Sequence, residues 1–286
     1  QNPKTKALDT LNTRQILQVM NDEDKSVALT VERALPQIEK AVDAIVTALN
    51  EDGRLIYIGA GTSGRLGVLD AVECVPTFGT PPSLVLGLIA GGDSAFIQAV
   101  EGAEDNVDAG AEDLKAINLQ ANDIVIGIAA SGRTPYVLGA LDYAKSIHVS
   151  TVGISCNEPA ELLTVADIPI PLPVGAEILT GSTRLKAGTA QKMVLNMLST
   201  ASMVKIGKAY GNLMVDVKIT NAKLQIRAER ILMKLTGIDE ASASDLLERA
   251  EGSVKVAVVM HHENSSRTEA LQRLAEANGS LREIIG

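Results

Sequence analysis

The sequence is poor in histidine and in aromatic residues. Its 286 residues include three histidines, four tyrosines, two phenylalanines and no tryptophan. A zinc site built from nitrogen and sulfur ligands is not expected, because the only two cysteines, Cys74 and Cys156, are isolated and lack metal-binding spacing. We expect both to be reduced thiols. Carboxylates are then the expected carriers for any proton transfer near neutral pH.

Positive charge and long apolar runs are also scarce. The chain has 26 Lys and Arg against 35 Asp and Glu, a net charge of -9, which argues against a nucleic-acid partner because binding phosphates requires clustered cations. The longest apolar stretch, residues 84–92, is about half the length of a membrane span. Residues 1–6 contain no apolar core of a signal peptide. We expect a cytoplasmic protein without a membrane partner.

Apolar runs followed by small-residue loops and helical patterns predict the fold. Four such runs lie at residues 55–58, 84–89, 124–128 and 149–154. Continuous apolar strands are typical of a parallel sheet that is covered on both faces. A fifth run, residues 166–171, contains two prolines and fits a sheet edge. We predict an α/β fold, an αβα sandwich around a parallel five-stranded sheet.

Helical patterns lie on both sides of this region. Apolar spacing predicts helix within residues 11–50, where the polar cluster 21–24 precedes the periodic run. A long helix follows Gly181, and short charged helices fill the C-terminal part, although residues 254–260 also fit a strand. The predicted domains are an N-terminal helical segment (1–50), a sandwich domain (51–214) and a small α-helical, UBA-like domain (215–286).

Two loops after predicted strands are suited to binding phosphate. Residues 59–64 match G-x-G-x-x-G, but residues 77–84 lack the carboxylate that a dinucleotide fold places on a ribose. Thr62 and Ser63 instead put hydroxyls at a helix N-terminus, which favours a terminal phosphate. Ser131, Arg133 and Thr134 repeat the arrangement before Pro135, which can begin a helix. The alternative is that these residues only cap helices and form turns.

Several motifs together resemble the N-acetylmuramic acid 6-phosphate etherase family over nearly the whole chain. They are Gly-Ala-Gly-Thr-Ser-Gly-Arg at residues 59–65, Ala-Val-Glu-Cys at 71–74, Val-Glu-Gly-Ala-Glu-Asp at 100–105, Ala-Ser-Gly-Arg-Thr-Pro-Tyr at 130–136 and Gly-Thr-Ala-Gln-Lys at 188–192. The resemblance implies a sugar isomerase (SIS) fold that binds a phosphosugar without a nucleotide cofactor or a metal. It also implies a cytoplasmic homodimer that recycles cell-wall sugar.

The resemblance further implies removal of the D-lactyl ether from carbon 3 of N-acetylmuramic acid 6-phosphate. In the open-chain sugar the C1 aldehyde acidifies the C2 proton, so cleavage becomes a β-elimination followed by addition of water. By motif match, Glu73 is the acid that protonates the departing lactate and Glu104 is the base at C2. The two roles require different pKa values, and the reverse assignment of acid and base stays open.

Other interpretations remain open from the sequence. Glu101 and Asp105 are close to Glu104 and have similar chemistry. Val72 and Val75 replace the Ser and Pro that related sequences often carry beside the first glutamate, which affects packing there. An aldose-ketose isomerase would share the phosphate loops and the C2 base. A non-catalytic phosphosugar sensor resembling the glucokinase regulatory protein would not need both carboxylates, so their presence favours an enzyme.

Overall fold

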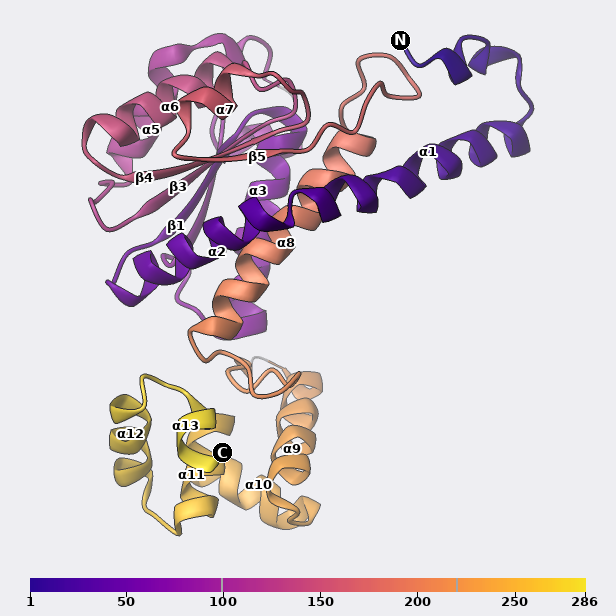
Figure 1. Cartoon of the computed structure of the whole chain (residues 1–286). Helices are drawn as coiled ribbons and strands as arrows, with labels where there is room; N and C mark the ends of the chain where they lie inside the picture. The colour runs from indigo at the N-terminus through magenta and orange to yellow at the C-terminus, as the bar shows by residue number, and fades with distance from the viewer. Residues whose placement is uncertain (99, 220) are drawn as a thin grey trace. The chain divides into compact units, whose positions relative to one another are not determined.

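A computed structural model describes residues 1–98, 100–219 and 221–286 of the chain (Figure 1). The described chain forms two compact units. The first comprises Gln1–Val72 and Ser83–Ser199, and the second comprises Glu73–Pro82 and Thr200–Gly286. The domain boundaries expected from the sequence, at residues 51 and 215, stay predictions. Within these residues, no helix combines the length and the apolar character needed to cross a bilayer.

The first unit is built on the five-stranded parallel sheet that the apolar runs predict. Its strands are β1 (Leu55–Gly59), β2 (Val85–Ile89), β3 (Ile124–Ala129), β4 (Ser150–Ser155) and β5 (Ile168–Pro171), in the order β2-β1-β3-β4-β5. All neighbouring pairs are parallel. Every residue of β1 and β3 is buried, as expected of strands covered on both faces. The proline-containing strand β5 lies at the edge, which confirms its prediction.

Helices cover both faces of this sheet (Figure 1). On one face, α5 (Val107–Ala116), α6 (Pro135–Ser146) and α7 (Glu161–Val165) bury their apolar side chains against β1 and β3. On the other face, α3 (Gly61–Phe78) approaches the sheet closely at Gly67, where a Cβ would lie 2.9 Å from Tyr57 Cβ. The helix α8 (Lys186–Lys205) packs beside α3 and is joined to it by side-chain hydrogen bonds. The αβα sandwich is confirmed.

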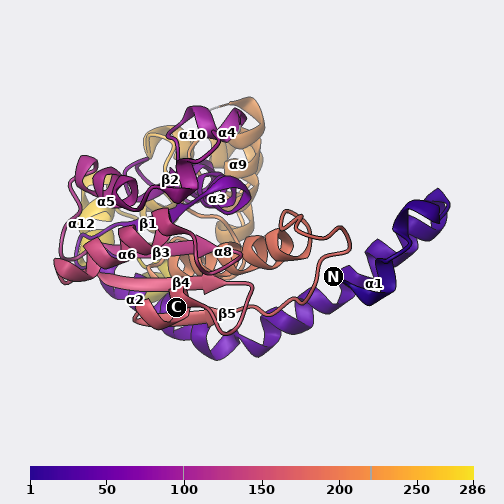
Figure 2. The ribbon, with the colours of Figure 1, turned by 90° about the horizontal axis from the view of Figure 1, so that it is seen from above.

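Two helices precede the sheet, α1 (Thr13–Arg33) and α2 (Leu35–Asn50). The predicted helical segment is therefore confirmed, with a break at Ala34 because a proline follows in the first turn of α2. The polar cluster at residues 21–24 lies inside α1, because Asn12 and Gln15 form a capping box nine residues earlier. The first half of α1 extends beyond the sandwich (Figure 2).

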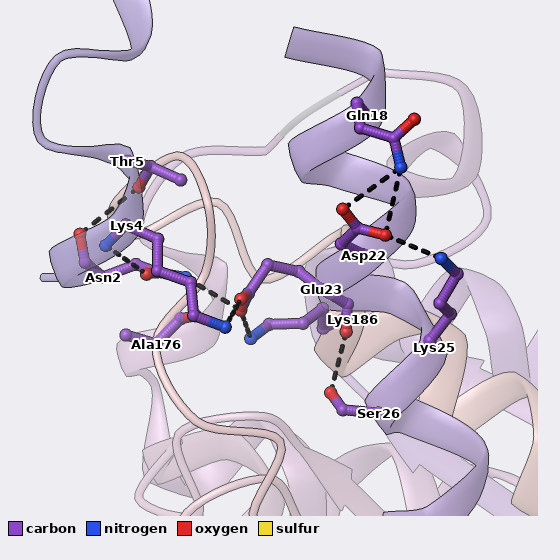
Figure 3. A network of polar contacts seen from close by, with 10 residues as sticks. All are labelled: Asn2, Lys4, Thr5, Gln18, Asp22, Glu23, Lys25, Ser26, Ala176 and Lys186. Carbon is purple, nitrogen blue, oxygen red and sulfur yellow. Dashed lines mark hydrogen bonds and ion pairs between the residues drawn. The ribbon is translucent and has the colours of Figure 1, made fainter. Parts of the chain in front are cut away.

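A polar network around the buried Glu23 fixes the N-terminal segment to the start of α8 (Figure 3). The Glu23 carboxylate accepts hydrogen bonds from the Lys186 ammonium at 2.8 Å and from the Lys4 ammonium at 2.9 Å. The Lys186 bond, followed by the Lys4 bond, lowers the pKa of Glu23 to about 2. Glu177 is also buried, and its carboxylate accepts the first two backbone N–H groups of α8. This network satisfies the helix N-terminus, so α8 begins at a fixed position.

The second unit is helical, as the sequence predicts. It contains α9 (Ala222–Thr236), α10 (Glu240–Arg249), α11 (Val254–Glu263), α12 (Arg267–Glu276) and α13 (Leu281–Ile285). The strand alternative for residues 254–260 is wrong. Those residues begin α11, which is capped by Ser253, and all seven are buried. A helix surrounded by neighbours is apolar on every side, which explains why its pattern was ambiguous.

Candidate active site

The candidate site lies at the carboxyl edge of the sheet, where the loops after β1, β2 and β3 begin. Strand β1 lies between β2 and β3, and Gly59 at its end is paired with Ile89 on one side and Ile128 on the other. After β1 the chain first forms β2 on one side of β1 and later forms β3 on its other side. In open parallel sheets, ligands bind outside the strand ends at such a switch point.

The loop after β1 owes its shape to two glycines. The backbones of Gly59 and Gly64 approach so closely that a Cβ on Gly64 would lie 2.6 Å from the Gly59 carbonyl oxygen. Only glycine permits this approach, which brings the first turn of α3 directly over the end of β1. The backbone N–H groups at the start of α3 then point out of the strand end, toward any anion bound there.

Thr62 and Ser63, the predicted phosphate contacts of this loop, lie in the first turn of α3. Thr62 is half-buried. Ser63 is 6% exposed, and its hydroxyl donates to Gln191 Oε1 on α8 at 2.9 Å. This bond joins residues 128 positions apart and is not predictable from local sequence. The hydrogen bond ties Ser63 to α8, and Thr62 lies beside it in the same turn of α3.

The loop after β3 carries Ser131, Arg133 and Thr134, as predicted. Ser131 Oγ accepts the Arg133 backbone N–H at 3.3 Å. Thr134 is the N-cap residue of α6, with Pro135 in the first turn, but its hydroxyl makes no capping bond. The Arg133 side chain is exposed and forms no ion pair with the described residues. The Thr134 hydroxyl and the Arg133 guanidinium are therefore both available to an anion.

A pocket of about 170 Å³ adjoins the loop after β1. It contains both glutamates of the segment that follows β2, Glu101 and Glu104. Its lining residues are Ala60, Gly61, Arg65, Ala90, Ala95, Val100, Glu101, Gly102, Ala103 and Glu104. Glu104 is exposed and lies in the short helix η3 (Ala103–Asp105), which begins after Gly102 at a φ of 74°. The structure thus brings Glu104 together with the glycine loop.

Arg65 also lines the pocket, although it is not among the residues predicted from the sequence. Its guanidinium donates to the carbonyl oxygens of Ala95 at 2.7 Å and Phe96 at 2.9 Å. It thereby ties α3 to the segment between β2 and η3, which carries Glu104. Its position in the motif at residues 59–65 could have indicated this, because Arg65 lies four residues after Gly61 and therefore on the same face of the helix.

Glu73, the second predicted catalytic residue, lies about three turns further along α3 than Gly61. Its side chain is exposed. It begins the short segment Glu73–Pro82 that is grouped with the second unit. All residues that line the pocket belong to the first unit. Of the two predicted catalytic glutamates, Glu104 lines it and Glu73 does not.

Tyr136 and Cys156, two titratable groups close to the strand ends, have structural roles. Burial, followed by a 2.6 Å hydrogen bond to Asp113, raises the pKa of Tyr136, so this phenol stays protonated and joins α6 to α5. Burial, followed by the charge of Glu177, raises the pKa of Cys156 to about 12. A thiol with that pKa is not a nucleophile near neutral pH. Cys74 is likewise a buried thiol.

Comparisons with known proteins agree with this geometry. The chain matches the N-terminal SIS domain of glucokinase regulatory protein over residues 37–145, the SIS domain over 102–201, and the C-terminal lid domain of glucokinase regulatory protein over 211–256. It is 57% identical over 284 residues to N-acetylmuramic acid 6-phosphate etherase 2 of Lactiplantibacillus plantarum, covering 99% of this chain and 96% of the relative. It is 56% identical to the N-acetylmuramic acid 6-phosphate etherase of Bacillus cereus (strain ATCC 10987), covering 99% and 97%.

Solved structures share the fold of the first unit. Phosphoheptose isomerase of Francisella tularensis superposes with a TM-score of 0.55 at 19% identity, covering 68% of this chain and 100% of that one. Phosphoheptose isomerase of Neisseria gonorrhoeae superposes with a TM-score of 0.52 at 14% identity, covering 67% and 99%. At these identities the likeness concerns the fold alone.

Proposed function

Because the chain belongs to the N-acetylmuramic acid 6-phosphate etherase family, we propose that it cleaves the D-lactyl ether of N-acetylmuramic acid 6-phosphate. The products are N-acetylglucosamine 6-phosphate and D-lactate, and one water is consumed. The reaction serves the recycling of cell-wall sugar in the cytoplasm. The observation that carries the proposal is the carboxylate of Glu104 in a pocket beside a phosphate-type helix N-terminus.

In this mechanism the anchor is the 6-phosphate. Thr62 and Ser63 bind it at the start of α3, and Ser131 and Thr134 bind it from the loop after β3. Arg133 pairs with the phosphate or with the lactyl carboxylate, since its planar fork suits either anion. Fixing one end of the open-chain sugar holds C2 and C3 in register with the carboxylates, which removes much of the entropic cost of the reaction.

Two proton transfers then cleave the ether. Glu104 removes the C2 proton, the electrons form the C2–C3 double bond, and the C3–O bond breaks. Glu73 gives its proton to the departing lactate oxygen. Water adds at C3 of the unsaturated aldehyde and a proton returns to C2, which restores both carboxyl groups. No nucleotide or metal is required, because the substrate's own aldehyde stabilises the charge that develops when C2 loses its proton.

The test is incubation with N-acetylmuramic acid 6-phosphate and an assay for D-lactate. Release of lactate supports the etherase, and its absence from folded protein that binds the phosphosugar contradicts it. The isomerase alternative is not favoured by the named relatives, and it would convert an aldose into a ketose without releasing lactate. The sensor alternative has the family-model matches to glucokinase regulatory protein in its favour. It predicts binding of the phosphosugar without turnover.

The proposal includes a homodimer, as the family resemblance implies. Leu17 and Leu29 on α1 are 59% and 55% exposed, and exposed large apolar side chains on one helix are typical of a subunit contact. Light scattering of the purified protein measures the mass directly. A monomer at micromolar concentration would contradict this part of the proposal and leave the chemistry unaffected.

A further inference from the structure

Gln191 lies behind the phosphate loop with half of its amide unused. It belongs to α8, its residue is fully buried, and its Oε1 accepts the Ser63 hydroxyl at 2.9 Å. Its Nε2 has no hydrogen-bond partner among the described residues. Buried side-chain amides normally use both ends, because an unpaired donor in the interior is costly. The starts of α3 and α8 lie side by side at this point, since a Cβ on Gly188 would be in ordinary van der Waals contact with Thr62 Cγ2 at 3.5 Å.

The direction of the Ser63 bond matters for an anion. A hydroxyl has one proton, and in this arrangement Ser63 gives it to Gln191. Ser63 would then present only lone pairs to a phosphate, which repel it. A half-turn of the amide about its last side-chain bond exchanges the two ends. Nε2 then donates to Ser63 Oγ, and the Ser63 proton becomes available to a phosphate oxygen.

We infer that Gln191 is a positioning residue whose amide donates to Ser63 Oγ and aims the Ser63 hydroxyl at the phosphate of the bound sugar. The identity of the ligand, a phosphosugar, rests on the proposed function. Gln191 itself does not touch this substrate and acts through Ser63. This role uses the unpaired donor and links α8 to substrate binding. The polarised chain runs from the Gln191 amide through the Ser63 hydroxyl to the phosphate, and each bond in such a chain strengthens the next.

The test compares Gln191→Glu with Gln191→Met. The glutamate keeps the size of the side chain but can only accept when ionised, so it holds the Ser63 proton away from the phosphate. The methionine removes both polar ends and leaves Ser63 able to donate. We expect KM for N-acetylmuramic acid 6-phosphate to rise at least about tenfold in Gln191→Glu and by less in Gln191→Met, with kcat within about twofold in both. Equal rises in KM, or none, would overturn the inference.

A double-mutant cycle separates positioning from general loosening of the α3–α8 contact. Combined with Ser63→Ala, Gln191→Glu should raise KM little further, because the hydroxyl that it misdirects is gone. The same rise in both backgrounds would overturn the inference. Asn196→Ala is the matched control, since Asn196 is also on α8 and its amide reaches α3 through Asp70 at 2.7 Å. Its KM should equal that of the unaltered protein.

Binding of inorganic phosphate, measured by calorimetry, keeps this test independent of the proposed reaction. If the unaltered protein binds phosphate but releases no lactate, the etherase proposal fails. Weaker phosphate binding by Gln191→Glu, about tenfold, would still support the role of Gln191. If the unaltered protein releases lactate and Gln191→Glu binds phosphate equally well, the role of Gln191 fails and the etherase stands.

Discussion

Two pairs of glutamates in the first unit have the same side chain and opposite surroundings. Glu23 and Glu177 are buried, and each accepts at least two hydrogen bonds around the start of α8. Glu101 and Glu104 line an open pocket, and their side chains pair with none of the described residues. Cations and N–H groups around a buried carboxylate replace the hydration that it loses, so this pair stabilises the fold. A carboxylate without such partners can contact a molecule bound in the pocket, which a catalytic base requires.

The largest effect is expected at Glu104, one of the two glutamates that line the pocket. Glu104→Gln removes the base at C2, and kcat should fall roughly 10²- to 10⁴-fold, the usual contribution of general base catalysis. Thermal unfolding should stay unchanged, since Glu104 is exposed. Exchange of the product's C2 proton in deuterated water, followed by NMR, should stop. Glu73→Gln should stop lactate release while that exchange continues, and the opposite pattern would interchange the two roles.

The next largest effect is expected on stability, when the buried Glu23 loses the cation that it pairs with. Lys186→Met leaves the Glu23 carboxylate buried without its closest cation, and loss of one partner of a buried ion pair costs about 3–5 kcal/mol. Urea unfolding measures this change in the free energy of unfolding. The control is Lys25→Met, since Lys25 pairs with Asp22 on the exposed face of the same helix as Glu23. It should cost less than about 1 kcal/mol. Similar costs for the two variants would remove the contrast between buried and exposed pairs.

A pH titration sharpens the same contrast. The pKa of Glu23 is about 2 in the folded protein and 4.5 in its ordinary state. Because the folded pKa is the lower one, Glu23 stabilises the fold fully above about pH 5, and the contribution is lost as pH falls from 4.5 to 2. Its size is roughly 3 kcal/mol. The difference in unfolding free energy between the unaltered protein and Glu23→Gln should shrink over this range. A difference that stays constant with pH would contradict the lowered pKa.

How far the sequence predicts these two regions depends on whether the signal is local. The strands and the glycine loop were predictable, because apolar runs and G-x-G-x-x-G are read from neighbouring residues. The bonds of Arg65 were not, since its partners lie about thirty residues away and are backbone carbonyls that any sequence supplies. Gln191 was missed for the same reason: its partner Ser63 is 128 residues distant.

A smaller effect on kcat is expected from a substitution of Arg65, which lines the same pocket as Glu104. Arg65→Lys keeps the charge but cannot hold the two carbonyl oxygens of Ala95 and Phe96 with one planar group. The segment that carries Glu104 should become less well positioned, and kcat should fall about tenfold with little change in phosphate affinity. Single-turnover kinetics and phosphate calorimetry measure these two quantities. A loss of phosphate affinity with normal kcat would place Arg65 in the anion site instead.

The smallest effect is expected at Asp105, directly after Glu104. Both side chains are exposed in the same turn of η3, but only Glu104 lines the pocket. Asp105→Asn removes the same charge as Glu104→Gln, one residue further along. If catalysis depends on a proton acceptor inside the pocket, kcat for Asp105→Asn should stay within about twofold of the unaltered enzyme. If it depends only on negative charge near the sheet edge, the two variants should lose activity equally. Since a neighbouring charge is screened by water and a missing base is not replaced, we expect the first result.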